Sequence, residues 1–128
     1  MDNRRNIITP GISYTDRQVN LANEQRIRSN PQTIKEQIYE AAQERWGVEE
    51  ADAVIWIVNN ESSFRQYIKN GNCCGLFQRL NRCSDSILGD LNGQIVEGLD
   101  YIQSRYKTPS EAKRVWLEHK AKTGHGWY

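Results

Sequence analysis

An uninterrupted apolar run in the middle of the chain, residues 53–58, limits what this sequence can fold into more than any other feature. The run lies in a helical pattern that starts near Glu49, where acidic side chains favour the positive end of a helix dipole. The predicted helix is apolar on most of its circumference, and such a helix is normally buried with other elements packed around it. We therefore expect a mostly α domain with this helix at its centre.

Three further segments have apolar residues at helical spacing. The first starts at Pro31, which suits the first turn of a helix, and ends at Gly47. The second covers residues 91–106, where apolar side chains recur every three or four positions. The last begins near Pro109 and is broken by Gly124. Together with the central helix, they predict a helical domain over residues 32–128.

Two segments lack this periodicity. Residues 65–89 are rich in Asn, Gly, Cys and Ser, so we expect loops, short helices at most, or a small β-hairpin there. Residues 1–31 are polar, and only residues 19–28 resemble a short helix. We interpret residues 1–31 as an N-terminal arm, which is either a flexible terminus or a segment that docks onto a partner.

Charge and hydropathy argue against two classes of partner. The net charge is +1 and the sequence pI is 7.7, without the clustered basic face that nucleic-acid binding requires. The longest apolar run is far shorter than the roughly 20 residues that span a membrane. The N-terminus also lacks the apolar core of a secretory signal. We therefore expect a protein made in the cytoplasm that binds neither nucleic acid nor membrane.

Three cysteines, Cys73, Cys74 and Cys83, lie close together in the loop-rich segment. A zinc site needs about four ligands, and the two histidines, His119 and His125, lie far away in the sequence. We therefore expect no metal and no other cofactor. Neighbouring cysteines rarely bridge each other, which leaves a bridge from Cys83 to one of them, or three free thiols.

Glu61 is the candidate for acid chemistry. It comes directly after the buried helix and shortly before Phe64, so apolar neighbours are expected to raise the pKa of its carboxyl group by desolvation. Cleavage of a glycosidic bond requires a carboxylic acid that stays protonated near neutral pH. The alternative for an isolated Glu at a helix end is an exposed surface carboxylate.

Four sequence motifs favour the chemical interpretation. Residues 61–64 (ESSF) and 75–78 (GLFQ) resemble the E-S-x-F and G-L-x-Q signature of lytic transglycosylases and phage lysozymes of the soluble-lytic-transglycosylase type. Residues 98–109 (GLDYIQSRYKTP) and 126–128 (GWY) resemble the C-terminal part of the same superfamily. The resemblance covers residues 33–128 and implies a lysozyme-like fold with a substrate cleft in the loop-rich segment.

The resemblance also implies roles for single residues. Glu61 matches the catalytic acid/base, which cleaves the β-1,4 bond between N-acetylmuramic acid and N-acetylglucosamine in bacterial peptidoglycan. Ser62 matches a serine that touches the cleft, Gln78 matches a glutamine that lines the glycan subsites, and Tyr101 matches a tyrosine near the site.

Other aromatic residues are candidates for stacking against sugar rings, first of all Phe77 and Tyr67. For Phe64, Leu76, Phe77 and Trp116 we favour a position in the core over one in the cleft wall, because aromatic and apolar residues at such spacings are mostly buried.

Two reaction outcomes follow from a single acid. Either the muramoyl 6-hydroxyl closes a 1,6-anhydro ring, or water attacks and the enzyme is a hydrolase. A second carboxylate would favour hydrolysis, but none of the downstream acids holds a motif position. These acids are Asp85, Asp90, Glu97 and Asp100.

The expected partner is the glycan strand of bacterial peptidoglycan. Without a signal, such an enzyme would reach the wall as part of a phage particle or through a pore at lysis, and residues 1–31 would be free to bind other phage structural proteins. The alternative function is a catalytically silent lysozyme-like component of a phage particle that binds the wall or has a structural role.

Overall fold

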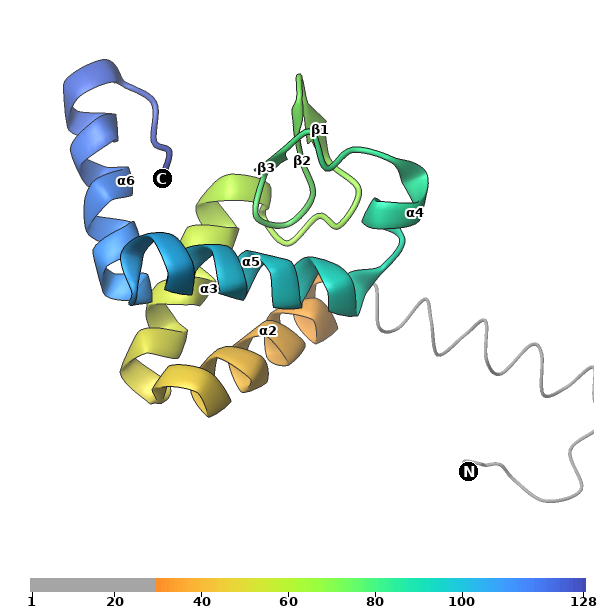
Figure 1. Cartoon of the computed structure of the whole chain (residues 1–128), viewed down its shortest axis with the longest axis horizontal. Coiled ribbons are helices and arrows are strands. Elements are labelled where there is room, and N and C mark those ends of the chain that lie inside the picture. The colour runs from red at the N-terminus through yellow and green to blue at the C-terminus, as the bar shows by residue number, and fades with distance from the viewer. Residues whose placement is uncertain (1–29) are drawn as a thin grey trace, which may run out of the picture. The chain divides into compact units, whose positions relative to one another are not determined.

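The computed structural model describes residues 30–128 (Figure 1). This part of the chain is mostly helical, with five helices and one small antiparallel sheet. The helices are α2 (Pro31–Trp46), α3 (Val48–Ser62), α4 (Asp85–Leu88), α5 (Leu91–Tyr106) and α6 (Pro109–Thr123). The predicted short helix at residues 19–28 and all but the last two residues of the predicted N-terminal arm lie outside the described part. Pro31, which the prediction gave to the arm, is the first residue of α2.

Helix α3 is the centre of the domain, as the apolar run predicts. It contacts α2 on one side and α6 on the other, while α5 crosses in front of it (Figure 1). Six of its side chains are buried. They are Ala51, Ala53, Val54, Ile57, Val58 and Ser62. Because α3 is buried between other helices, the residues in its last turn are held in fixed positions.

The end of α3 differs from the sequence expectation by one turn. The helix continues through Ser62, so Glu61 lies inside its last turn and not after it. Ser63 and Phe64 then adopt left-handed backbone conformations, with φ of 51° and 60°, and the Ser63 amide donates to the Asn59 carbonyl. These two consecutive left-handed residues end the helix abruptly, so Glu61 lies at the C-terminal end of α3.

The loop-rich segment forms a three-stranded sheet where a single hairpin was the most that the sequence predicted. The strands are β1 (Lys69–Asn70), β2 (Cys73–Cys74) and β3 (Arg79–Leu80), in the order β1-β2-β3 and antiparallel throughout. A disulfide between Cys74 and Cys83 joins β2 to the segment before α4, and Cys73 is free. Of the two cysteine arrangements left open, the bridged one is present.

The predicted boundaries of α2, α5 and α6 are confirmed. Helix α2 ends before Gly47, which has a φ of 98° that suits glycine. The Asp90 side chain caps α5 by accepting from the Gly93 amide, and Thr108 caps α6 by accepting from the Glu111 amide. No helix in residues 30–128 is both long and apolar enough to cross a membrane.

Candidate active site

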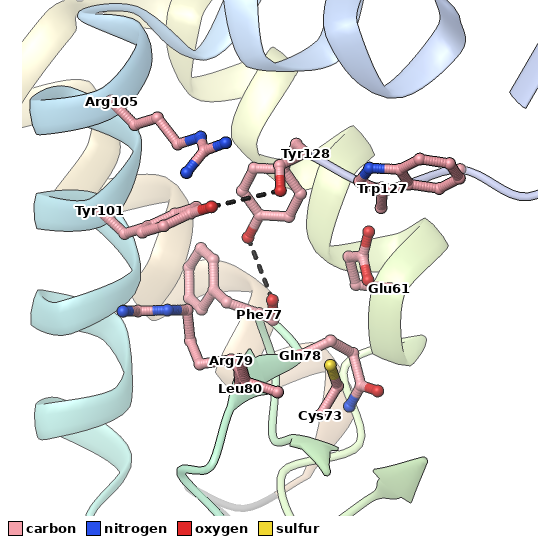
Figure 2. A pocket seen from close by; sticks show the side chains of 11 residues that line it. Glu61, Cys73, Phe77, Gln78, Arg79, Leu80, Tyr101, Arg105, Trp127 and Tyr128 are labelled. Atoms are coloured by element: carbon pink, nitrogen blue, oxygen red, sulfur yellow. Dashed lines mark hydrogen bonds between the residues drawn. The ribbon is translucent and has the colours of Figure 1, made fainter. Parts of the chain in front are cut away.

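A pocket of about 600 Å³ opens between the end of α3, the sheet and α5, and Glu61 is one of the residues that line it (Figure 2). Its other lining residues come from β2 and β3, from the turn between them, from α5 and from the C-terminal segment. These residues are Cys73, Phe77, Gln78, Arg79, Leu80, Tyr101, Arg105, Gly126, Trp127 and Tyr128. Glu61 is the only carboxylate side chain among the described residues that line this pocket.

The carboxyl group of Glu61 is partly buried and has one side-chain partner. Trp116 on α6 donates a hydrogen bond of 2.6 Å from Nε1 to Glu61 Oε2. Burial raises the pKa of Glu61 from 4.5 to about 7, although the bond from Trp116 lowers it in part by stabilising the charged form. A carboxyl group with such a pKa exchanges its proton readily at neutral pH, as a general acid/base must.

Gln78 lines the same pocket as the acid and is the last residue of the turn before β3. Its φ of 51° is in the left-handed region, which is uncommon for a residue other than glycine. The side-chain amide is held in place, because Nε2 donates to the Gly75 carbonyl at 2.8 Å and Oε1 accepts from Asn70 Nδ2 at 2.9 Å. An unusual backbone held by specific hydrogen bonds is typical of functional sites.

A buried glutamine on α5 holds this turn from behind. Gln94 Oε1 accepts from the Leu76 amide at 2.8 Å, and its Nε2 donates to the carbonyl oxygens of Gln66 and Leu88. Gly75 leaves room for this contact, since a Cβ at that position would lie 2.5 Å from Gln94 Oε1. The turn that carries Phe77 and Gln78 is thereby tied to the helical framework.

Two tyrosines close another side of the pocket. Tyr128 donates a hydrogen bond from its hydroxyl to the Phe77 carbonyl at 3.1 Å, and Tyr101 donates to the Tyr128 carbonyl at 3.2 Å (Figure 2). The pKa of the Tyr128 hydroxyl is raised well above 10, mainly by burial and next by the nearby Glu61 charge, so it remains a donor.

The structure brings together most of the residues that the sequence predicts for the site. Phe77, Gln78 and Tyr101 line the same pocket as Glu61, but the Phe77 side chain is 2 % exposed and belongs to the core, so it is not free to stack on a sugar ring. Ser62 does not line it, because its side chain is 2 % exposed and donates to the Val58 carbonyl within α3. Tyr67 is also outside the pocket and is 57 % exposed. The structure thus gives Ser62 a place in the helix end and leaves Tyr67 on the surface.

The other carboxylates that the sequence analysis considered have positions outside the pocket. Asp90 caps α5, Glu97 pairs with Arg82, and Asp100 pairs with Arg45 at 2.8 Å. Asp85 is exposed in the first turn of α4. Among residues 30–128, Glu61 therefore has no second carboxylate side chain beside it in the pocket.

Sequence reasoning missed several pocket residues. Arg105 and the tail residues Trp127 and Tyr128 belong to the quoted motifs, so a signal was present, but no site role was given to them. Arg79 carries no signal beyond its place next to Gln78. Residues 30–128 hold no group of three or more His, Cys, Asp or Glu side chains placed to bind a metal ion. Comparisons of the chain with family models, curated proteins and solved structures find no match.

Proposed function

We propose that residues 32–128 form a lysozyme-like domain that cleaves the β-1,4 bond between N-acetylmuramic acid and N-acetylglucosamine in bacterial peptidoglycan. The observation that carries the proposal is the carboxyl group of Glu61, which faces a pocket and has a pKa of about 7. The sequence motifs around Glu61 and Gln78 support the choice of substrate, and both residues line one pocket.

In the proposed reaction, Glu61 first acts as an acid. Its protonated carboxyl group gives the proton to the glycosidic oxygen, the bond from that oxygen to C1 of the muramoyl sugar breaks, and the second sugar leaves with a hydroxyl group. The positive charge that develops at C1 lies near the new carboxylate. Trp116 Nε1 donates to Glu61 Oε2 at 2.6 Å, so the carboxylate keeps a donor when it becomes charged.

Glu61 then acts as a base. We propose that it removes the proton from the muramoyl 6-hydroxyl as that oxygen attacks C1, which gives the 1,6-anhydro product and returns the acid to its starting state. This outcome fits a described pocket with a single carboxylate side chain, because hydrolysis with a separate base would need a second one. The proposed enzyme is thus a lytic transglycosylase.

The test is to incubate the wild type and Glu61→Gln with purified peptidoglycan and to analyse the soluble products by mass spectrometry. Glu44→Gln, an exposed change on α2, is the matched control. We expect anhydro-muropeptides from the wild type and the control, and a loss of at least about 100-fold for Glu61→Gln. Reducing-end products would instead identify a hydrolase. Equal release by wild type and Glu61→Gln would contradict the role of Glu61.

The second candidate function is the catalytically silent component of a phage particle that binds the wall. Binding of peptidoglycan without release of soluble products from several wall types would favour it over the enzyme.

A further inference from the structure

Two arginines and a tyrosine form a stack at one side of the pocket. The guanidinium carbon of Arg79 lies 4.4 Å from the centre of the Tyr101 ring. That of Arg105 lies 5.9 Å from the same ring and 5.7 Å from the centre of the Tyr106 ring. Figure 2 shows Arg105 above the ring and Arg79 below it, with Glu61 on the other side of the pocket. The face of an aromatic ring attracts a guanidinium group, and the contact limits the motion of that group.

Neither arginine has an ion-pair partner in the described chain. In residues 30–128, no carboxylate lies within ion-pair distance of Arg79 or Arg105. In contrast, Arg82 and Arg114 form ion pairs with Glu97 and Glu111. When Glu61 is protonated, none of the described side chains that line the pocket is negatively charged, while the two arginines are positive.

Both guanidinium groups keep unused donors. Arg79 Nη1 donates to the Glu97 carbonyl at 3.3 Å, and Arg105 Nε donates to the Tyr106 hydroxyl at 3.1 Å. Each guanidinium has five N–H groups in a planar fork, which matches the two oxygens of a carboxylate. A second, more open hollow lies beside Arg79 and Tyr101, so a bound chain has space to continue past the two rings. Glu97 and Asp100 also line this hollow, and they are paired with Arg82 and Arg45.

We propose that Arg79, held on the face of Tyr101, and Arg105, held beside the rings of Tyr101 and Tyr106, bind carboxylate groups of the glycan and select an acidic glycan over a neutral one of the same length. This inference rests on the proposed function, since it assumes that a glycan occupies the pocket. In peptidoglycan, two sources supply the carboxylate: the lactyl group of a muramic acid without peptide, or the acidic residue of an attached peptide. A polymer of N-acetylglucosamine alone supplies neither.

The experiment measures binding by calorimetry, with Glu61→Gln as the background so that no cleavage occurs. Three tetrasaccharides of alternating N-acetylglucosamine and N-acetylmuramic acid are compared. The first has free lactyl carboxylates, the second has them as methyl esters, and the third carries an Ala-Glu dipeptide on each lactyl group. Each is tested at low and high salt.

We expect the free carboxylate or the dipeptide form to bind about tenfold more tightly than the ester at low salt, because a charge-assisted hydrogen bond stabilises the complex by that order. The form that binds better identifies the source of the carboxylate. High salt should reduce the preference, since screening weakens an exposed charge contact. Arg79→Gln and Arg105→Gln should weaken binding of the charged form more than binding of the ester, and so lower the preference.

Arg114→Gln, on the exposed side of α6, is the matched control and should keep the full preference. If Arg79→Gln does not fold, Arg79→Lys replaces it in the test. The salt dependence of the preference for the charged sugar is then also measured on the Glu61→Gln protein without a further change. Equal affinity for charged and esterified sugars would overturn the inference and leave the proposed function in place. Failure of all three sugars to bind would overturn both.

Discussion

Trp116 and Glu61 are 55 residues apart in the sequence, yet the indole Nε1 lies 2.6 Å from the carboxylate Oε2. This bond crosses from α6 to the last turn of α3 and opposes the effect of burial on the acid. The pKa of Glu61 is therefore set by two elements: the apolar surroundings of α3 raise it, and a single donor on α6 lowers it.

Replacing Trp116 by Phe should raise the pKa of Glu61 further, because the charged form loses its donor while the apolar surroundings remain. Glycan release should decrease as pH rises and Glu61 loses its proton. We expect this decrease to occur about one pH unit higher in Trp116→Phe than in the wild type. The measurement is a pH profile of product release. Trp46→Phe is the control, since Trp46 Nε1 donates to the Lys107 carbonyl instead. An unchanged profile would contradict the proposed coupling.

The pH dependence of stability should report the same group. The pKa of Glu61 is about 7 in the folded protein and near 4.5 when unfolded, so the folded state binds more protons between these values and loses stability as pH rises through this window. Glu61→Gln removes this loss. We expect it to match the wild type at pH 4 and to exceed it by about 2 kcal/mol at pH 8, allowing for partial exposure.

Denaturant unfolding at both pH values measures this difference, with Glu44→Gln as the control. A wild type that gains stability relative to Glu61→Gln on going to pH 8 would show that the acid is not desolvated.

Removal of the disulfide should destabilise the domain. The bridge closes a short loop between Cys74 and Cys83, which by the chain-entropy treatment stabilises the fold by about 2.5 kcal/mol. The double change Cys74→Ser and Cys83→Ser should lower the Tm by roughly 10 °C. Thermal unfolding followed by circular dichroism measures this. Cys73→Ser, which leaves the bridge intact, should show no comparable loss.

Gly98→Ala tests the contact between α5 and the turn that carries Gln78. A Cβ at Gly98 would overlap the Phe77 ring, so the ring must shift. Alanine is the better helix former by about 1 kcal/mol, but overpacking outweighs this, and we expect a net loss of about 1–3 kcal/mol together with weaker glycan release. Asn92→Ala, exposed on the same helix, is the control. Higher stability of Gly98→Ala would show that the turn adapts freely.

The helices were predictable because their limits depend on local chemistry. Pro31 and Pro109 start helices, Gly47 and Gly124 end them, and the apolar run between them specifies the buried helix. The small sheet was harder, since its strands have only two residues each and leave no periodic pattern. The sequence therefore predicts one hairpin at most and does not reveal the second.

In the site, too, the features set by local sequence were predictable and those set by contacts between distant elements were not. Glu61 and Gln78 stand in recognisable motifs, and each lines the pocket. The bond from Trp116 and the stacking of Arg79 on Tyr101 join residues from different elements, so no local pattern reveals them. Ser62 illustrates the converse case, because its motif position is clear while its hydroxyl bonds back into its own helix.

The bridge between Cys74 and Cys83 makes the stretch between them a covalent ring, and four pocket residues lie within it. They are Phe77, Gln78, Arg79 and Leu80. The two ends of the ring are 5.2 Å apart at their Cα atoms, and Leu76 and Phe77 anchor the ring in the core, so these positions cannot change freely. Its more exposed part, which includes Gln78, Arg79 and Leu80, is where substrate preference can diversify, by evolution or by grafting, while the acid on α3 stays where it is.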